Sequence, residues 1–232
     1  DNIMPPCGQL ANSKVQICWL VFLSLSCGIF FACFAETFRH SWDAYTHLFF
    51  ADHYLKTWFN LYEPRWFTGF SVAAYPPAAH QILAFLVALG GGPERGLKVM
   101  LVAVHLLFVL GVYRWVRTLT DQESAFCAAL LALVIPSFYV GLHAFGQVPF
   151  LFSVSLCLHT VAETQRYLQR NVSLVRPVCA AVAAVSSHHI TAGLFLLPLL
   201  LILIFQACGD KTAVRDAGRR MAAVFVVQLL YR

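Results

Sequence analysis

Long uninterrupted apolar runs are the feature of this sequence that most restricts its fold. The first run covers about residues 15–35. Later runs cover about residues 97–116, 125–142, 148–161, 175–187, 190–207 and 221–232. A helix of about 20 apolar residues can cross a bilayer, because its backbone groups are hydrogen-bonded within the segment. With a mean hydropathy of +0.70, the sequence predicts an all-α polytopic helical membrane protein.

The basic residues predict which loops face the cytoplasm. A shorter apolar run at about residues 78–89 decides the answer, because each crossing reverses every later loop. If this run stays at the surface and the N-terminus is cytoplasmic, all later basic loops fall inside, as the positive-inside rule requires. If it crosses, the loop holding Arg166, Arg170 and Arg176 moves outside. We therefore predict that it does not cross.

This topology defines the expected organisation of the chain. Residues 1–232 form a single transmembrane domain, which we expect to be the N-terminal part of a longer protein. A first external loop, at about residues 36–96, carries helices that lie on the membrane and is followed by at least six further spans. The basic residues end apolar runs and form no aromatic-lined stripe, so the net charge of +5 predicts no nucleic-acid partner.

The stretch from residue 39 to residue 80 gathers ionisable groups immediately after the first span. Charges beside a bilayer are costly to desolvate, so such a cluster indicates a functional site. Ser41 can cap a helix there, with Asp43 in its first turn. On that helix Asp43 and His47 lie four residues apart and share a face, whereas Asp52 points away and can pair with Lys56.

Asp43 has two interpretations. As a functional group, its carboxylate can accept a proton from a hydroxyl or hold a metal, in a setting with Arg39 and His47 nearby. As a structural group, it caps a helix at the water interface. Arg65, with Trp66 beside it, also has two interpretations. Its planar fork is suited to binding phosphate, or it anchors the loop to lipid headgroups.

Further polar groups are expected on the same side of the membrane as Asp43. His143 and Gln147 fall in the second external loop, and His188 and His189 fall at the outer end of another span. A single membrane histidine is most often a satisfied core residue. Several polar groups on one side of the membrane favour a shared site.

The order of these features resembles the GT-C superfamily of membrane glycosyltransferases, in which one span precedes a long external loop that opens with an aspartate. A narrower resemblance is to a bacterial membrane family labelled "6-pyruvoyl-tetrahydropterin synthase-related", whose label does not describe its chemistry. It rests on short motifs in a fixed order: WDAYTHL at 42–48, PRW at 64–66, FTG at 67–69, YPP at 75–77, GQVP at 146–149 and SHHIT at 187–191.

The resemblance implies a transferase that takes a sugar from a polyprenyl-phosphate-linked donor. Asp43 would act as general base towards the acceptor hydroxyl, and Arg65 is a candidate to stabilise the leaving phosphate. The substrate-binding candidates are Arg39, His47, Arg65, Trp66, His143, Gln147, His188 and His189. Membrane lipids and the lipid-linked sugar are the expected partners. The expected location is the bacterial inner membrane, with the Asp43 loop outside.

The resemblance also bears on metals. The oligosaccharyltransferase branch is metal-dependent and places an acidic ligand in the second external loop, where this chain has His143 and Gln147. We therefore expect no cofactor and do not favour a divalent metal. Two other functions remain open: an ion-coupled transporter that uses Asp43 and the histidines, and a catalytically inactive GT-C-like scaffold.

Overall fold

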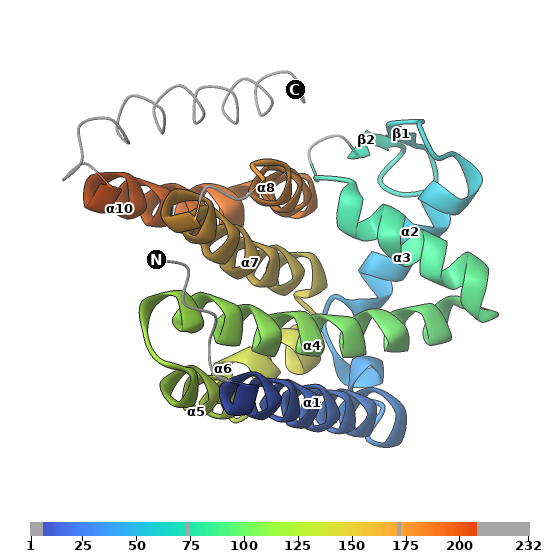
Figure 1. Ribbon diagram of the computed structural model, residues 1–232. Helices are drawn as coiled ribbons and strands as arrows, with labels where there is room; N and C mark the ends of the chain where they lie inside the picture. The colour runs from blue at the N-terminus through green and yellow to red at the C-terminus, as the bar shows by residue number, and fades with distance from the viewer. Residues whose placement is uncertain (1–6, 73–74, 171–172, 208–232) are drawn as a thin grey trace.

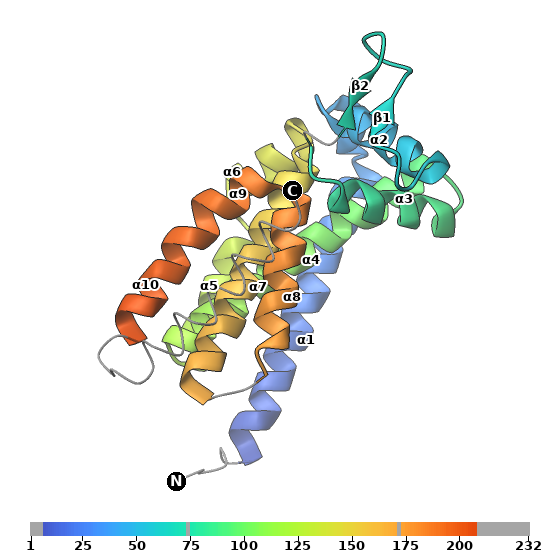
Figure 2. The same cartoon turned by 90° about the horizontal axis from the view of Figure 1, so that it is seen from above.

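The computed structural model describes residues 7–72, 75–170 and 173–207, and most of them are helical (Figure 1). The elements in chain order are α1 (Cys7–Ile29), η1 (Phe30–Phe34), η2 (Thr37–His40), α2 (Ala44–Lys56), β1 (Tyr62–Glu63), β2 (Phe70–Ser71), α3 (Ala78–Gly90), α4 (Pro93–Leu119), α5 (Gln122–Ala132), α6 (Pro136–Tyr139), η4 (Val140–Ala144), α7 (Val148–Arg170), α8 (Val175–Ser187), α9 (His189–Thr191), η5 (Ala192–Leu196) and α10 (Leu197–Ala207). The long helices form a bundle, and α2, α3 and a small hairpin gather at one end of it (Figure 2).

Within the part of the chain that the structure describes, two helical segments are long and apolar enough to cross a membrane, Ser13–Phe34 and Pro93–Leu119. The first of them confirms the span predicted at about residues 15–35. Gln122–Ala132 and Pro136–Ala144 form a third candidate, a pair bent by 48°. Pro136 begins the second half of this pair, where a residue without a backbone N–H is tolerated.

The predicted run at about residues 221–232 lies outside the described residues, and fewer spans pass this test than the six predicted within them. Helix α7 has 23 residues, but its sequence includes His159, Glu163 and Gln165, which lower its hydropathy. Helix α8 has only 13 residues. The run at 190–207 comprises the short helix α9, the π-helical turn η5 and α10. His159, Glu163 and Gln165 of α7 are buried within the bundle, so a hydropathy average underestimates how well this helix packs.

Helix α3 corresponds to the short apolar run whose crossing decides the topology. Its 13 residues rise about 20 Å, less than the roughly 30 Å of a hydrocarbon core. It begins after Pro77 and ends at Gly91, whose φ of 76° is left-handed and favours glycine. One face of α3 packs against both α2 and α4. The helix is therefore too short to cross the membrane alone.

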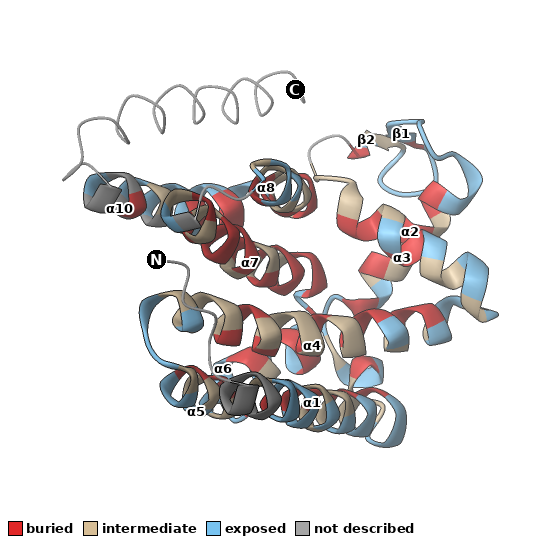
Figure 3. Ribbon diagram, in the orientation of Figure 1, coloured by how far each residue is buried: buried red, intermediate tan, exposed pale blue. Residues whose placement is uncertain are grey.

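The loop between α1 and α4 is part of the core. One cluster of buried side chains joins Tyr54 of α2, Leu83 of α3, Met100 of α4 and Leu142 of η4. Buried residues line the inner faces of the helices, whereas α1 exposes much of its outer surface (Figure 3). Trp19 and Phe22 on α1 are more than half exposed, as expected for side chains that face lipid.

A two-stranded antiparallel hairpin follows α2. Tyr62 pairs with Ser71 and Glu63 pairs with Phe70. Its turn is tight, because Gly69 has a φ of 97° and a Cβ at this position would lie 1.9 Å from the Tyr62 hydroxyl oxygen. This hairpin is the β structure among the described residues, most of which are helical, as the sequence predicted.

Candidate functional site

The N-terminus of α2 is held by the loop that links η4 to α7. The backbone N–H of Trp42 donates to the Ala144 carbonyl at 3.1 Å, and that of Asp43 donates to the Phe145 carbonyl at 3.2 Å. Ser41 supplies the cap, because its Oγ accepts from the Ala44 N–H at 3.3 Å. Helix α2 begins at Ala44, so Asp43 is the N-cap residue. The sequence had predicted that Asp43 lies in the first turn of the helix.

The carboxylate of Asp43 makes no capping hydrogen bond. The residue is exposed, and no ion pair or hydrogen bond joins its side chain to another described residue. The structural interpretation of Asp43 as a capping carboxylate therefore does not match the geometry. Burial lowers the pKa of His47 and raises that of Tyr75; the charge of Asp43 opposes the first effect and adds to the second, so both side chains lie near it.

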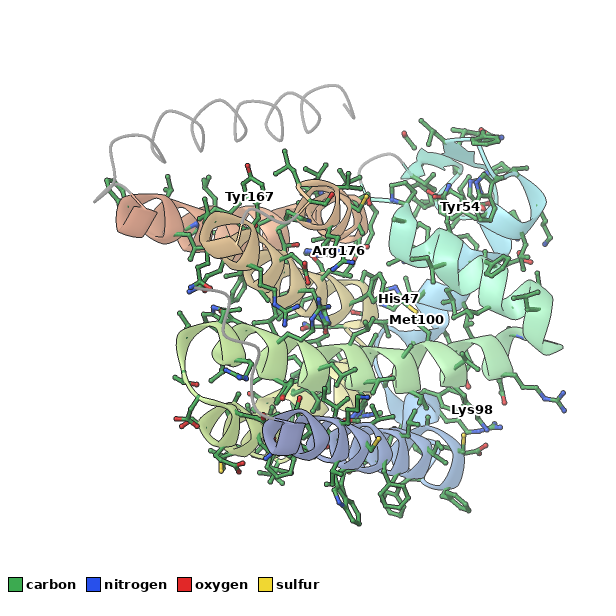
Figure 4. The ribbon with its side chains drawn as sticks, viewed as in Figure 1. His47, Tyr54, Lys98, Met100, Tyr167 and Arg176 are labelled. Carbon is green, nitrogen blue, oxygen red and sulfur yellow. The ribbon has the colours of Figure 1, made fainter. Side chains whose placement is uncertain are left out.

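His47 lies under Asp43, on the side of α2 that faces the rest of the protein (Figure 4). Its Nε2 donates to the Gly146 carbonyl at 2.9 Å, because a carbonyl oxygen can only accept. Its Nδ1 lies 3.0 Å from Nε2 of His80. Burial lowers the pKa of His47 to about 4, against the opposite influence of Asp43 and Gly146. Burial also lowers the pKa of His80 well below its usual value.

Gly146 permits the close contact between this loop and α2. Its φ is 71°, a left-handed conformation that favours glycine. A Cβ at this position would lie 2.8 Å from the backbone nitrogen of Ala44 and 3.1 Å from that of Asp43. A larger residue would therefore push the loop away from the N-terminus of α2.

His188 reaches the same region from the end of α8. Its ring contacts Tyr75 edge-on, with ring centroids 5.9 Å apart, and its charge affects His47. Its Nδ1 accepts from the Thr191 hydroxyl at 2.6 Å, which fixes the ring. His189 is exposed, and its ring is stacked beside that of His188. The structure thus brings Asp43, His47 and His188 to one end of the bundle.

His143 is placed elsewhere. It is buried, and its ring nitrogens contact the Thr37 hydroxyl at 2.7 Å and Nε2 of His105 at 2.9 Å. Phe31 stacks on the His143 ring. His143 therefore belongs to a polar pair between helices and not to the group around Asp43. Gln147 is exposed and lies in the loop that contacts α2, next to Gly146.

Both candidate arginines are already paired. Arg39 forms ion pairs with Glu36 at 2.6 Å and with Glu94 at 2.8 Å. Arg65 donates to both oxygens of Glu63, at 2.8 and 2.6 Å, and also pairs with Asp52.

The Arg65 network lies at the other end of α2 from Asp43. The hydrogen bonds from Arg65 lower the pKa of Glu63 to about 2, and Glu63 in turn raises the pKa of Arg65. Glu63 also accepts from His53 at 2.9 Å. Trp66 packs there with Phe49, over which Arg65 is placed. Asp52 pairs with Lys56 at 2.7 Å, as predicted.

A groove of about 500 Å³ lies along α2, beside α3 and the start of α4. Its lining is mostly apolar and comprises Tyr45, Leu48, Phe49, Ala51, Asp52, Leu55, Val87, Pro93 and Glu94. Among the described residues, His, Cys, Asp and Glu side chains do not converge in groups of three that could hold a metal ion.

Two residues near Asp43 were not identified as site residues from the sequence. Tyr75 appeared there only within the YPP motif, and His80 was not among the candidates. Both reach the site because Pro76 and Pro77 turn the chain into α3, which packs against α2. No local pattern indicates this contact, since His47 and His80 are 33 residues apart.

Comparison with known proteins identifies the class. Residues 74–231 match the family of dolichyl-phosphate-mannose-protein mannosyltransferases. This match covers more than half of the chain, so the chain belongs to that family. Neither a curated protein nor a solved structure matches the chain.

Family membership fixes the coarse description of the protein. It is an integral, polytopic membrane protein of the GT-C superfamily, from a family of membrane glycosyltransferases that use polyprenyl-phosphate-linked sugars. The match supports the superfamily and not the narrower pyruvoyl-tetrahydropterin synthase-related resemblance, which stays a prediction. It begins at residue 74, so it includes the partners of α2 but not Asp43 itself.

Proposed function

We propose that this chain transfers a sugar from a polyprenyl-phosphate donor to an acceptor hydroxyl, with Asp43 as the general base. The observation that carries the proposal is the state of the Asp43 carboxylate. It is exposed, unpaired among the described residues and held at the positive end of a helix, beside a group of histidines. A carboxylate in that state is available to accept a proton.

The proposed reaction is an inverting displacement at the anomeric carbon. The acceptor hydroxyl donates a hydrogen bond to Asp43 and transfers its proton to the carboxylate as its oxygen attacks. The bond between the anomeric carbon and the phosphate oxygen breaks, and the electron pair leaves with the lipid monophosphate. The loop contacts at Trp42 and Asp43 keep the base in place.

We assign the polar groups at the Asp43 end to the sugar and the leaving phosphate. His188, His189 and Gln147 lie at this end, and burial raises the pKa of Tyr75, which keeps its hydroxyl available as a donor. Arg39 and Arg65, with Trp66, remain sequence-based candidates. To bind phosphate, each arginine would have to exchange a carboxylate partner for it. His143 would act only through the loop that it precedes.

The proposed orientation follows the charges at the two ends of the bundle. Arg114 and Arg117 lie near the C-terminus of α4, Arg166 near that of α7 and Arg176 at the start of α8, and these helix ends lie away from α2 (Figure 2). The positive-inside rule then places Asp43 on the external face, and we propose a bacterial inner membrane as the location.

The test is the isosteric variant Asp43→Asn in proteoliposomes. It keeps the shape of the side chain and removes the base, so we expect transfer of labelled sugar from the polyprenyl-phosphate donor to fall about 100-fold to 10,000-fold. Binding of the donor and the thermal midpoint should be unchanged. Transfer at the wild-type rate would contradict the role of Asp43.

One observation favours the alternative of ion-coupled transport. His105 and His143 are both buried and contact each other at 2.9 Å between helices. Histidines within a membrane can carry protons. Proton uptake into proteoliposomes that is lost in His105→Gln but kept in Asp43→Asn would favour this alternative. Absence of transfer and of uptake would favour an inactive scaffold.

A further inference from the structure

A second charged cluster lies at the end of the bundle opposite to Asp43. Arg114 of α4 binds Glu163 of α7, and another of its nitrogens lies 3.0 Å from Nδ1 of His159. The Nε2 of His159 donates to the Leu107 carbonyl at 3.0 Å. Only 5% of the Glu163 side chain is exposed. The ion pair of Arg114 with Glu163 joins α4 to α7 and explains how the Glu163 carboxylate can be buried.

The cluster contains more positive than negative charge. The positive charges of Arg166 and Arg176 both lie close enough to affect Arg114. Glu163 is the acidic residue whose negative charge affects Arg114. Arg166 contacts Glu163 only at 3.4 Å, and its side chain is 37% exposed. Arg176 lies at the start of α8 (Figure 4), is exposed and forms no ion pair with a described residue.

Glu163 cannot neutralise the two outer arginines. Its Oε1 is shared between Arg114 and Arg166, and its buried Oε2 has no hydrogen-bond partner among the described residues. A bidentate pair with Arg166 is therefore not formed. The N–H groups of Arg166 and Arg176 remain available to another anion.

The position of these arginines indicates which anion they meet. Arg166 lies near the C-terminus of α7 and Arg176 at the start of α8, at the basic end of the bundle, where we expect phospholipid headgroups to surround the protein. An arginine fork matches two phosphate oxygens, and basic pockets between membrane helices bind anionic headgroups. We propose that Arg166 and Arg176 bind the phosphate of an anionic lipid in the leaflet opposite to Asp43. This site is independent of the transferase chemistry.

The probe is spin-labelled phosphatidylglycerol in phosphatidylcholine vesicles that contain the full chain. Its association with the protein is measured by electron paramagnetic resonance, relative to spin-labelled phosphatidylcholine. One arginine contributes about 1 kcal/mol to such binding, so Arg176→Gln should lower the preference for phosphatidylglycerol about fivefold. Arg166→Gln with Arg176→Gln should lower it about 25-fold.

Arg117→Gln is the matched control, because Arg117 is exposed at the same end and donates to the Thr120 carbonyl. It should keep the preference within about twofold. An equal loss in Arg117→Gln, or no loss in Arg176→Gln, would overturn the proposal. Arg176→Gln decides even if the double variant does not fold, since Arg176 is exposed.

The source of the phosphate is tested separately. Inorganic phosphate added to the vesicles should leave the association of phosphatidylglycerol unchanged. Displacement of the spin-labelled lipid by inorganic phosphate would show that the two arginines bind a free anion, which would overturn the lipid assignment.

Discussion

The two ends of α2 carry similar side chains in different states. At the N-terminal end, Asp43 is exposed and has no partner among the described residues. At the C-terminal end, Asp52 and Glu63 are both bound by Arg65. A charge without a partner is available for chemistry, whereas a charge that is already paired contributes to stability. Proximity to the membrane alone therefore does not identify a functional residue.

The largest expected effect concerns the paired end. Glu63→Gln removes a fully buried carboxylate charge that Arg65 and His53 both bind. Breaking such a network costs about 3 kcal/mol, so we expect a lower thermal midpoint and faster proteolysis of the hairpin. Sugar transfer by the folded fraction should change little. If transfer is abolished while stability is kept, the two ends of α2 do not differ as described.

The two ends of α2 should lose stability in different pH ranges. Burial lowers the pKa of His47 from 6.5 to about 4, so the unfolded chain takes up this proton first. The stability that His47 contributes is complete above pH 6.5 and is lost as the pH falls to about 4, by roughly 2 kcal/mol at pH 5. His47→Gln should remove this pH dependence of the thermal midpoint. An unchanged profile would contradict the assignment.

Glu63 should titrate in a lower range. Its pKa is lowered from 4.5 to about 2, so its contribution is complete above pH 4.5 and is lost as the pH falls towards 2. Comparing the thermal midpoints of Glu63→Gln and the wild type across pH tests this window. A loss above pH 5 that depends on Glu63 would be inconsistent with the paired state.

Gly146→Ala sharpens the comparison at the unpaired end. The new Cβ would meet the backbone of Ala44 and Asp43, in addition to the cost of about 1 kcal/mol for a left-handed alanine. We expect slower transfer as well as lower stability. Gly91→Ala is the matched control, since Gly91 has a φ of 76° and its added Cβ would meet only the Arg95 side chain, at 3.3 Å. Equal transfer rates in the two variants would argue against a role for this contact.

The smallest effect is expected at Lys56. Lys56 and Asp52 form an exposed pair on one face of α2, with side chains that are 62% and 43% exposed. Lys56→Gln should change the free energy of unfolding by less than about 0.5 kcal/mol, because solvent screens such pairs. A thermal midpoint shifted as far as in Glu63→Gln would contradict this ranking.

Local patterns in the sequence were sufficient for the first span and for a contact between helix neighbours. The first span and the pair of Asp52 with Lys56 follow from hydropathy and from the spacing of helix neighbours. The break before Pro136 was missed, because the apolar run continues across it. Hydrophobicity alone does not show where a helix ends.

The contacts of the site depend on residues that are distant in the sequence. His47 binds the Gly146 carbonyl 99 residues away. The pairing of Arg65 with Glu63 and Asp52 depends on how the hairpin folds back on α2, so the sequence could suggest phosphate binding but not the presence of competing carboxylates. The same limit applies to His143, whose partner His105 lies on another helix.

The most direct test of the difference between the two ends compares Asp43→Asn with Asp52→Asn in the same vesicles. Single-turnover transfer from a polyprenyl-phosphate-linked sugar is measured for both variants. We predict at least about a 100-fold loss for Asp43→Asn and a change within about twofold for Asp52→Asn. Equal losses, or a loss confined to Asp52→Asn, would contradict the assignment of the unpaired carboxylate as the base.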